Sequence, residues 1–196
     1  MRVDLCEVDA FVKTKMSEER YDHVINVVET ATELAAFHGV DVTDAAYAAV
    51  IHDVAKEQPS EQTAAMLRLE GEGDYLNYSE KVWHAPMGAI IAKKTFLIED
   101  EDILNAIKYH TTGRANMSDL EKVIFVADYI EPDRTFPGAI KVRELREQLD
   151  LAVCEILRQK VEKVKALDLG MHPDTLAAYA YYKHITKVVN GLGSTV

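Results

Sequence analysis

Six histidines and aspartates lie within sequence segments that are otherwise apolar: His23, His52, Asp53, His84, His110 and Asp128. Burying an imidazole or a carboxylate costs free energy unless another group pairs with it. Imidazole nitrogens and carboxylate oxygens are ligands that suit iron, manganese, cobalt or zinc, and a divalent ion would offset the buried negative charge. Because Asp53 directly follows His52, its second oxygen could bridge two ions. The residue types therefore predict a site for one or two divalent metal ions.

A simpler interpretation exists for each of these residues taken alone. A single histidine on an apolar helix face is more often a hydrogen-bonded core residue than a metal ligand. Asp128 alone could be an ordinary carboxylate near a helix end, although that end of a helix favours cations. Six such groups together favour a shared ion. The sequence contains no HExxH or CxxC motif, so the ligands must converge from separate segments.

The elements that position these residues are predicted to be helices throughout. Apolar residues recur with helical spacing, and no segment sustains the alternation of a strand, so the fold class is all-α. Ser17 is expected to cap a helix that Gly39 ends and that carries His23. A second helix is predicted from about residue 43 to Glu57, and it carries His52 and Asp53.

The remaining candidate ligands are also placed on helices or at helix ends. Pro86 suits a first turn, which puts His84 at or just before the start of a helix. His110 shares a face with the apolar residues of a helix that Gly113 ends. Ser118 and Glu121 form a capping box for the helix of Asp128, which Pro132 ends. A long amphipathic stretch follows at 139–168, and a last helix follows Pro173.

Cationic and hydroxyl side chains accompany the candidate ligands. Arg20, Lys56, Arg114 and Arg134 each lie within six positions of one of them, which suggests countercharges for phosphates. In the segment HTTGR, Thr111 and Thr112 follow His110 and precede a glycine and an arginine, a composition that suits phosphate oxygens. Proximity in sequence is weak support alone, and HTTGR could equally be a simple turn that caps a helix.

Composition restricts the classes of protein. A chain of 196 residues can form one domain with a large core. The net charge of −11 and pI near 5.1 argue against nucleic acid or an anionic membrane as a partner. The first residues lack the pattern of a signal peptide, and no apolar run is long enough to span a membrane. The two cysteines form no CxxC motif, so neither a disulfide framework nor a thiolate metal site is indicated. We therefore expect a cytoplasmic protein that acts on a small molecule.

The order of the candidate ligands along the chain resembles the pattern of a known superfamily, the HD-domain metal-dependent phosphohydrolases. That pattern is His, then His-Asp, then a distant Asp. His23, His52-Asp53 and Asp128 match it. The string YHTTGRANMSDLEKVIFVADYIEPDRTFPG, together with His84, is similar to one branch, the YqeK-type symmetrical bis(5'-nucleosyl)-tetraphosphatases, over roughly residues 18–180. Asn116 stands where glycine is expected, but asparagine tolerates left-handed backbone.

The resemblance implies one HD domain over 1–196, with a core of about 18–135 and C-terminal helices of about 139–190. It also implies a metal centre, usually of iron, and cleavage of diadenosine tetraphosphate into two ADP. His23, His52, Asp53 and Asp128 would then hold the principal ion, while His84 and His110 would hold a second ion or contact phosphate.

The resemblance also implies roles for the neighbouring side chains. Asp53, Asp128 and Lys56 would act in catalysis, with one of the two aspartates orienting the nucleophile. The expected substrate contacts are Arg20, Lys56, His84, His110, Thr111, Thr112, Arg114, Asp133, Arg134, His172 and Thr175.

Three other interpretations stay open. An HD hydrolase could act on another nucleotide, such as a deoxynucleoside monophosphate. A mixed-valent di-iron centre on the same scaffold could serve an oxygenase. A metal-stabilised module could bind a nucleotide without cleaving it. The sequence also leaves open whether 139–168 belongs to the core or forms the surface of a homodimer.

Overall fold

The structure, a computed structural model, describes residues 2–166 and 170–192, and all regular elements in those ranges are helical. The α-helices are α1 (Leu5–Lys13), α2 (Glu18–His38), α3 (Val42–Ile51), α4 (Ser60–Leu69), α5 (His84–Thr95), α6 (Glu101–Tyr109), α7 (Asp119–Ile130), α8 (Pro137–Arg143), α9 (Leu149–Ala166) and α10 (Pro173–Leu192). Two 3₁₀ helices, η1 (Gly73–Asn77) and η2 (Glu80–Val82), lie between α4 and α5. The prediction of an all-α fold is confirmed.

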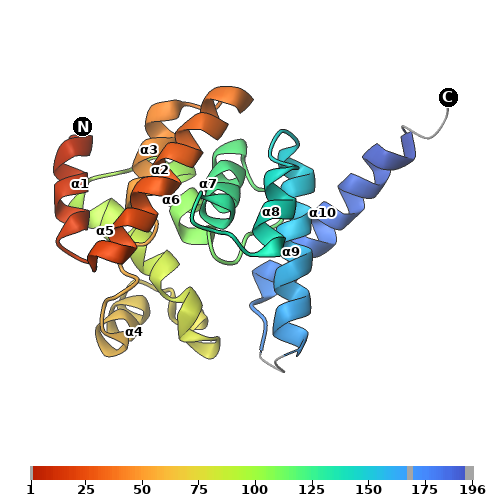
Figure 1. Cartoon of the computed structure of the whole chain (residues 1–196). Coiled ribbons are helices and arrows are strands. Elements are labelled where there is room, and N and C mark those ends of the chain that lie inside the picture. Colours follow the sequence, from red (N-terminus) through yellow and green to blue (C-terminus); the bar gives the residue numbers. More distant parts are fainter. Residues whose placement is uncertain (1, 167–169, 193–196) are drawn as a thin grey trace.

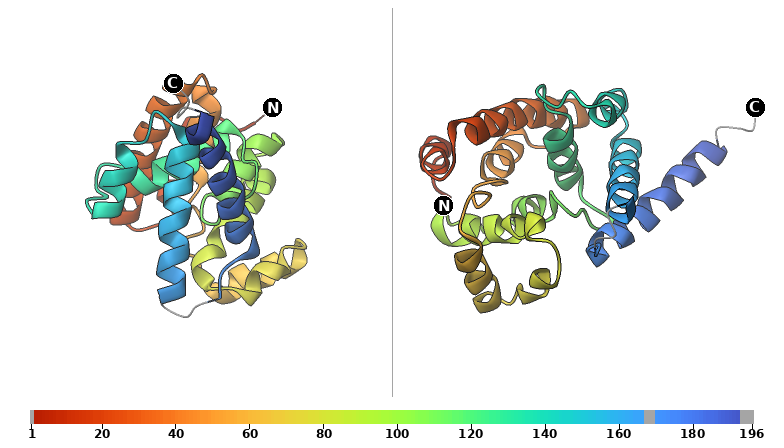
Figure 2. Two further views of the ribbon diagram at one scale, coloured as in Figure 1. Left: turned by 90° about the vertical axis from the view of Figure 1, so that its right-hand side faces the viewer. Right: turned by 60° about the horizontal axis from the view of Figure 1, so that its bottom comes forward.

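Helices α2, α3, α6 and α7 form the centre of the molecule (Figure 1). Helix α2 packs against α3 and α7, and α6 packs against α5 and α7. Helix α9 lies against α7 and α8, while α10 packs on α9 and then runs away from the body, as the turned views also show (Figure 2). This arrangement brings the ends of several central helices to one place.

Helix boundaries follow the predicted capping residues closely. The Ser17 hydroxyl accepts a hydrogen bond from the Arg20 backbone, and α2 ends at Gly39 with a φ of 72°. Ser118 and Glu121 form both bonds of a capping box at the start of α7. Asn116 has a φ of 54°, the left-handed backbone for which asparagine is suited. These local signals were sufficient because each cap acts within a few residues.

The predicted end of the second helix at Glu57 is wrong. Helix α3 stops at Ile51, and the chain then makes three successive tight turns that the backbone closes with Val54 N–H to Ile51 C=O, Lys56 N–H to Asp53 C=O and Gln58 N–H to Ala55 C=O. This segment winds more tightly than an α-helix. His52 and Asp53 are therefore at a helix end, and both are buried.

The amphipathic stretch at 139–168 is divided between two helices, because tight turns after Arg143 separate α8 from α9. Val153, Ile156 and Leu157 of α9 are fully buried in the core of this chain. This face is thus core and not a dimer surface. The end of this stretch, residues 167 and 168, lies outside the described residues, and the homodimer stays a prediction.

Helix α5 approaches the end of α3 unusually closely at Gly88. A Cβ atom at this position would lie 3.1 Å from Ile107 Cγ2 and 3.3 Å from the His52 carbonyl oxygen. The absent side chain allows the two backbones to come together. Four residues earlier on the same helix is His84, so this contact positions a candidate ligand.

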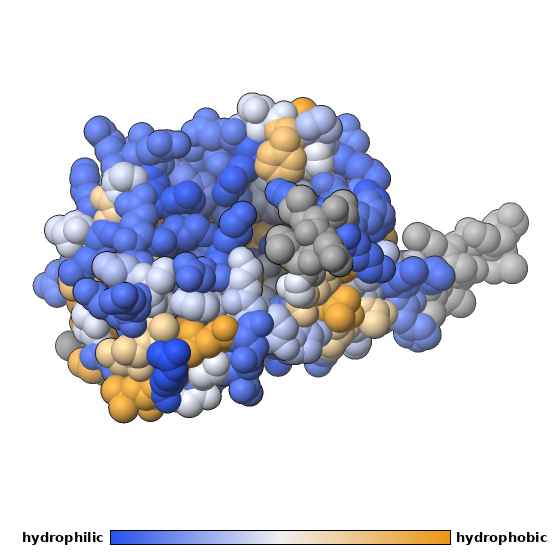
Figure 3. All heavy atoms as spheres, turned by 90° about the horizontal axis from the view of Figure 1, so that it is seen from below, coloured by the Kyte–Doolittle hydropathy of each residue, from blue (hydrophilic) through white to orange (hydrophobic). Residues whose placement is uncertain are grey.

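The surface carries few large apolar side chains. Seen from below, it is mostly hydrophilic, with apolar groups in separate patches (Figure 3). Within the described ranges, no helix combines the length and apolar character that crossing a bilayer requires. The cytoplasmic location stays a prediction.

Candidate metal centre

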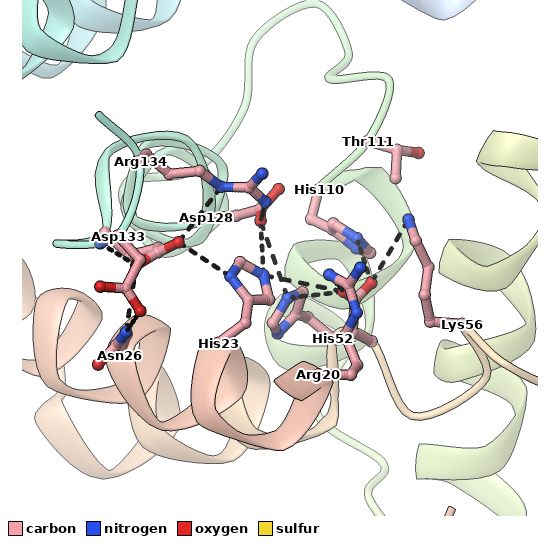
Figure 4. Close-up of polar contacts among 12 residues, drawn as sticks. Arg20, His23, Asn26, His52, Lys56, His110, Thr111, Asp128, Asp133 and Arg134 are labelled. Atoms are coloured by element: carbon pink, nitrogen blue, oxygen red, sulfur yellow. Dashed lines mark hydrogen bonds and ion pairs between the residues drawn. The ribbon is translucent and has the colours of Figure 1, made fainter. Parts of the chain in front are cut away.

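The carboxylate of Asp53 lies between two pairs of imidazoles. Three of these rings, those of His23, His52 and His110, are gathered together in Figure 4. The Oδ2 atom of Asp53 is 3.6 Å from His52 Nε2 and 3.8 Å from His23 Nε2. Its Oδ1 atom is 3.0 Å from His84 Nε2 and 3.6 Å from His110 Nε2. Each oxygen of this one carboxylate therefore faces a separate pair of histidines.

Asp128 completes the first of the two groups. Its Oδ1 atom lies 3.2 Å from His23 Nε2 and 4.0 Å from His52 Nε2. All six predicted ligands thus converge, and they come from α2, the end of α3, α5, the end of α6 and α7. The structure brings together residues more than one hundred positions apart in sequence.

Backbone carbonyls orient two of the imidazoles. His52 Nδ1 is 2.6 Å from the Ala49 carbonyl oxygen, and His110 Nδ1 is 2.7 Å from that of Ile107. A carbonyl oxygen only accepts, so each Nδ1 carries the proton and donates. Each Nε2 is then left with its lone pair directed at the cluster, which is the tautomer that binds a metal.

The cluster contains buried polar atoms that no protein group satisfies. Among the described residues, His23 Nε2, His52 Nε2 and Asp53 Oδ1 have no hydrogen-bond partner. Such atoms are uncommon in buried positions and costly to leave unpaired. A divalent cation would satisfy all three, so the donor set fits a metal ion.

The pKa values of His52, His84 and Asp53 favour the protonation states that bind a metal ion. Burial lowers the pKa of His52 and of His84 to about 4, so both imidazoles are neutral near neutral pH. Burial alone would raise the pKa of Asp53, but the surrounding histidines outweigh it and hold the pKa well below the ordinary value. Neutral imidazoles and an ionised carboxylate are the ligand forms that bind divalent metals.

Three cations border the centre. Arg20 Nη1 lies 3.2 Å from Asp53 Oδ2, Lys56 Nζ lies 3.9 Å from Asp53 Oδ1, and Arg134 Nη2 lies 3.5 Å from Asp128 Oδ1. Their side chains are 30%, 32% and 37% exposed, so each is in contact with both the cluster and the solvent. In Figure 4, Arg134 lies beside Asp128, whereas Arg20 and Lys56 lie on the side of His52 and His110.

The HTTGR segment is occupied by contacts to other elements. The Gly113 N–H donates to the Tyr109 carbonyl at 2.7 Å, as in a turn that caps a helix. Arg114 makes a two-pronged ion pair with the buried Glu121, at 2.7 and 2.6 Å. The carbonyl of Thr111 accepts a hydrogen bond from a lysine of α9, and Thr112 is buried. The structure therefore supports the capping interpretation for the backbone, and phosphate binding by these three residues stays a prediction.

The other predicted substrate contacts lie beside the centre or farther along the chain. Asp133 is exposed at its edge and accepts a hydrogen bond from Asn26 at 2.8 Å. His172 stacks on Tyr75 at 4.5 Å between ring centroids and lines a cavity of about 430 Å³. The Thr175 hydroxyl donates to the Thr112 carbonyl at 2.9 Å. A role of these residues in binding nucleotide stays a prediction.

Glu131 is a buried residue of the site that sequence analysis missed. Its Oε1 atom accepts a hydrogen bond from His23 Nδ1 at 3.2 Å, and its Oε2 atom accepts one from Asn26 Nδ2 at 3.3 Å. The contact with Nδ1 leaves Nε2 of His23 free to face Asp53 and Asp128. A carboxylate at the C-terminal end of a helix, where cations are favoured, was the only available signal.

Comparison with known proteins agrees with this geometry. Residues 20–133 match the model of the HD domain, and the match includes all six converging side chains. The chain belongs to the HD-domain family. A histidine and aspartate cluster within an HD domain indicates a divalent-metal site.

Relatives of this HD domain protein cover nearly its whole length. A protein of Halalkalibacterium halodurans named symmetrical bis(5'-nucleosyl)-tetraphosphatase is 44% identical, covering 86% of this chain and 91% of the relative. A Bacillus subtilis protein of the same name is 41% identical, covering 88% and 94%. A crystal structure of a predicted HD superfamily hydrolase involved in NAD metabolism, from Clostridium acetobutylicum, has a TM-score of 0.88 and 34% identity, covering 94% of this chain and 99% of that one. The predicted resemblance is confirmed.

Proposed function

We propose that this protein is a metal-dependent hydrolase that cleaves diadenosine tetraphosphate symmetrically into two molecules of ADP. The observation that carries the proposal is the position of the Asp53 carboxylate. Each of its two oxygens faces one pair of histidines, and Arg20 and Lys56 lie beside it. The names of the relatives from H. halodurans and B. subtilis support the choice of substrate.

The donor set defines which residues would hold the ions. His23, His52, Asp53 and Asp128 would hold the principal ion. His84 and His110 would either hold another ion, together with the second Asp53 oxygen, or contact phosphate themselves. A bound divalent ion lowers the pKa of a coordinated water and stabilises charge on phosphoryl oxygens. We propose iron as the physiological metal, with manganese, cobalt and zinc as alternatives that the same ligand types accept.

The cations next to the centre would bind the polyphosphate. Without an ion, Arg20 and Lys56 are the positive neighbours of Asp53, and Arg134 is that of Asp128. When a metal neutralises these carboxylates, the three cations remain near the surface with capacity for anions. Arginine and lysine donate charge-assisted hydrogen bonds to phosphate, so they would hold the substrate and stabilise the leaving ADP.

Asp128 is the aspartate better placed to orient the attacking water. Its side chain is 22% exposed, whereas that of Asp53 is 3% exposed. Burial alone would raise the pKa of Asp128, but the nearby imidazoles of His23, His52 and His110 outweigh it, hold the pKa below the ordinary value and keep the carboxylate ionised. An ionised carboxylate in contact with solvent can accept a hydrogen bond from water and align it for in-line attack on phosphorus.

The test is the identity of the products. Metal-depleted protein should gain activity when iron or manganese is added, and chromatography should show two ADP formed for each diadenosine tetraphosphate consumed. Asp53→Asn, which removes the shared charge, should lose both metal and turnover. Formation of AMP plus ATP would contradict symmetrical cleavage.

Ranking substrates by kcat/KM separates the alternatives. The panel contains diadenosine tetraphosphate, a deoxynucleoside monophosphate, and NAD, because the Clostridium relative is described as involved in NAD metabolism. Metal binding with no turnover of any of them would favour a nucleotide-binding module, and oxygen consumption would favour the oxygenase alternative.

A further inference from the structure

Lys160 of α9 lies outside the matched HD residues, but its side chain contacts two segments that carry candidate ligands. Its Nζ atom donates to the Thr111 carbonyl at 2.6 Å and lies 4.7 Å from the centre of the Phe125 ring. Thr111 directly follows His110, and Phe125 lies on α7 three residues before Asp128. The ammonium group is thus held between the two segments that carry candidate ligands from α6 and α7.

The ammonium group has no countercharge of its own. In residues 2–166 and 170–192, no carboxylate lies within ion-pair distance of Lys160, and its single hydrogen bond uses one of three N–H donors. By contrast, Lys108 and Lys122 on neighbouring helices, although also partly buried, pair with Glu72 and with Asp119 and Asp150. A lysine with a purely structural role would be expected to have such a partner.

Several of the charges that act on Lys160 belong to the centre. Burial lowers the pKa of Lys160 to about 8, Asp128 opposes this, and Lys56, Arg134 and Lys163 reinforce it. A cation that is partly withdrawn from water and has no carboxylate partner is unfavourable until an anion binds beside it. The position of Lys160 next to Thr111 therefore favours binding of an anion by its ammonium group.

We propose that Lys160 binds a phosphate group of the substrate adjacent to the one that is attacked, which extends the polyphosphate site beyond the HD ligands and rests on the proposed function. The geometry points to the adjacent phosphate because Lys160 makes no ion pair with Asp53 or Asp128, whereas Lys56 and Arg134 do. Lys160 would then help select a polyphosphate chain over a single phosphate group.

Lys160→Gln tests this proposal, with Lys163→Gln as the matched control. Lys163 is exposed on the same helix, one turn away. We expect Lys160→Gln to raise KM for diadenosine tetraphosphate about tenfold or more, the range expected for loss of one charge-assisted hydrogen bond. The metal content and kcat should change little, Lys160→Arg should restore part of the affinity, and Lys163→Gln should behave like the wild type.

Two further measurements distinguish binding from a structural role. Because the substitution removes a poorly compensated charge, Lys160→Gln should melt no lower than the wild type. A lower Tm with a proportional loss of activity would show that Lys160 only supports the Thr111 backbone, and an unchanged KM would also overturn the proposal.

Calorimetric titration with ADP gives a readout that does not depend on turnover. Metal-loaded wild type should bind ADP about tenfold more tightly than Lys160→Gln, for the same reason as above. If the wild type fails to cleave diadenosine tetraphosphate, the proposed function fails, but this titration still decides the role of Lys160. Equal ADP affinities would reject it.

Discussion

Asp53 is the residue that links the two histidine pairs. A single sequence position supplies both oxygens, so a change at this side chain affects all four imidazoles at once. Its role could be predicted because His52 and Asp53 are adjacent in an apolar run, where a polar pair needs a partner. Glu131 could not be predicted in this way, since its hydrogen bond to His23 spans 108 positions and only the fold shows it.

Substitution of Glu131 tests the orientation of His23. Glu131→Gln removes the charge that holds the Nδ1 proton, so the ring is less fixed and Nε2 is a weaker donor. We expect metal affinity to fall about tenfold or more, measured by competition with a chelator. Glu29→Gln, an exposed change on the same helix as His23, should leave the affinity unchanged. Equal affinities for the Glu131 variant and the wild type would show that His23 is fixed by other contacts.

At the scale of elements, the loop before α7 shows which contacts the local sequence predicts and which it does not. The capping box of Ser118 and Glu121 was predictable because both bonds lie within four residues. The same sequence gave no sign that Glu121 also pairs with Arg114, which the pattern assigned to phosphate. One buried carboxylate thus serves a helix start and an arginine at the same time.

Removal of the Arg114 guanidinium should therefore affect stability more than catalysis. In Arg114→Met the buried Glu121 keeps its charge but loses its main partner, and we expect a loss of about 1–2 kcal/mol, reduced by the partial exposure of Arg114. Chemical denaturation measures this loss, and kcat/KM of the folded variant tests the predicted phosphate contact, because an unchanged value would show that Arg114 has only the structural role. A raised KM at unchanged stability would instead support phosphate binding by Arg114.

The tight turns after α3 show a second limit of prediction. The hydrophobic spacing predicted a helix that continues to Glu57, because apolar periodicity does not distinguish an α-helix from a chain that winds more tightly. The observed turns place His52 and Asp53 at a helix end, where side chains from α2, α5 and α6 can reach them.

At the scale of the whole molecule, the start of α10 attaches the C-terminal helices to the HD body. His172 stacks on Tyr75 and packs against Tyr78, Thr175 donates to the Thr112 carbonyl, and the Tyr182 hydroxyl accepts from the Met117 backbone at 3.0 Å. The all-α class was predictable from periodicity, but this docking was not, because its hydrogen bonds join residues 63 and 65 positions apart without a local motif.

Docking through a buried histidine makes stability depend on pH. Burial lowers the pKa of His172 below its ordinary value of 6.5, so the unfolded chain takes up this proton first as the pH falls. The contribution is fully present above pH 6.5 and decreases as the pH falls from 6.5 toward the folded-state value.

His172→Phe keeps the stacked ring and removes this titration. Between pH 7.5 and 5.5 we expect the variant to lose less unfolding free energy than the wild type, with a difference of at most about 1.4 kcal/mol per pH unit. Denaturation at both pH values measures the difference, and the remaining histidines titrate in both proteins. Parallel pH profiles would show that His172 is as easily protonated in the folded state as in the unfolded one.

The contact at Gly88 has a consequence for the spacing within the centre. Helix α5 is held against the His52 carbonyl by backbone, and the helix carries His84 four residues earlier. The distance between His84 and Asp53 therefore depends on a contact with main-chain atoms, whose positions vary less than those of side chains. A methyl group at position 88 would meet both the His52 carbonyl and the Ile107 side chain, and it would push α5, with His84, away from Asp53.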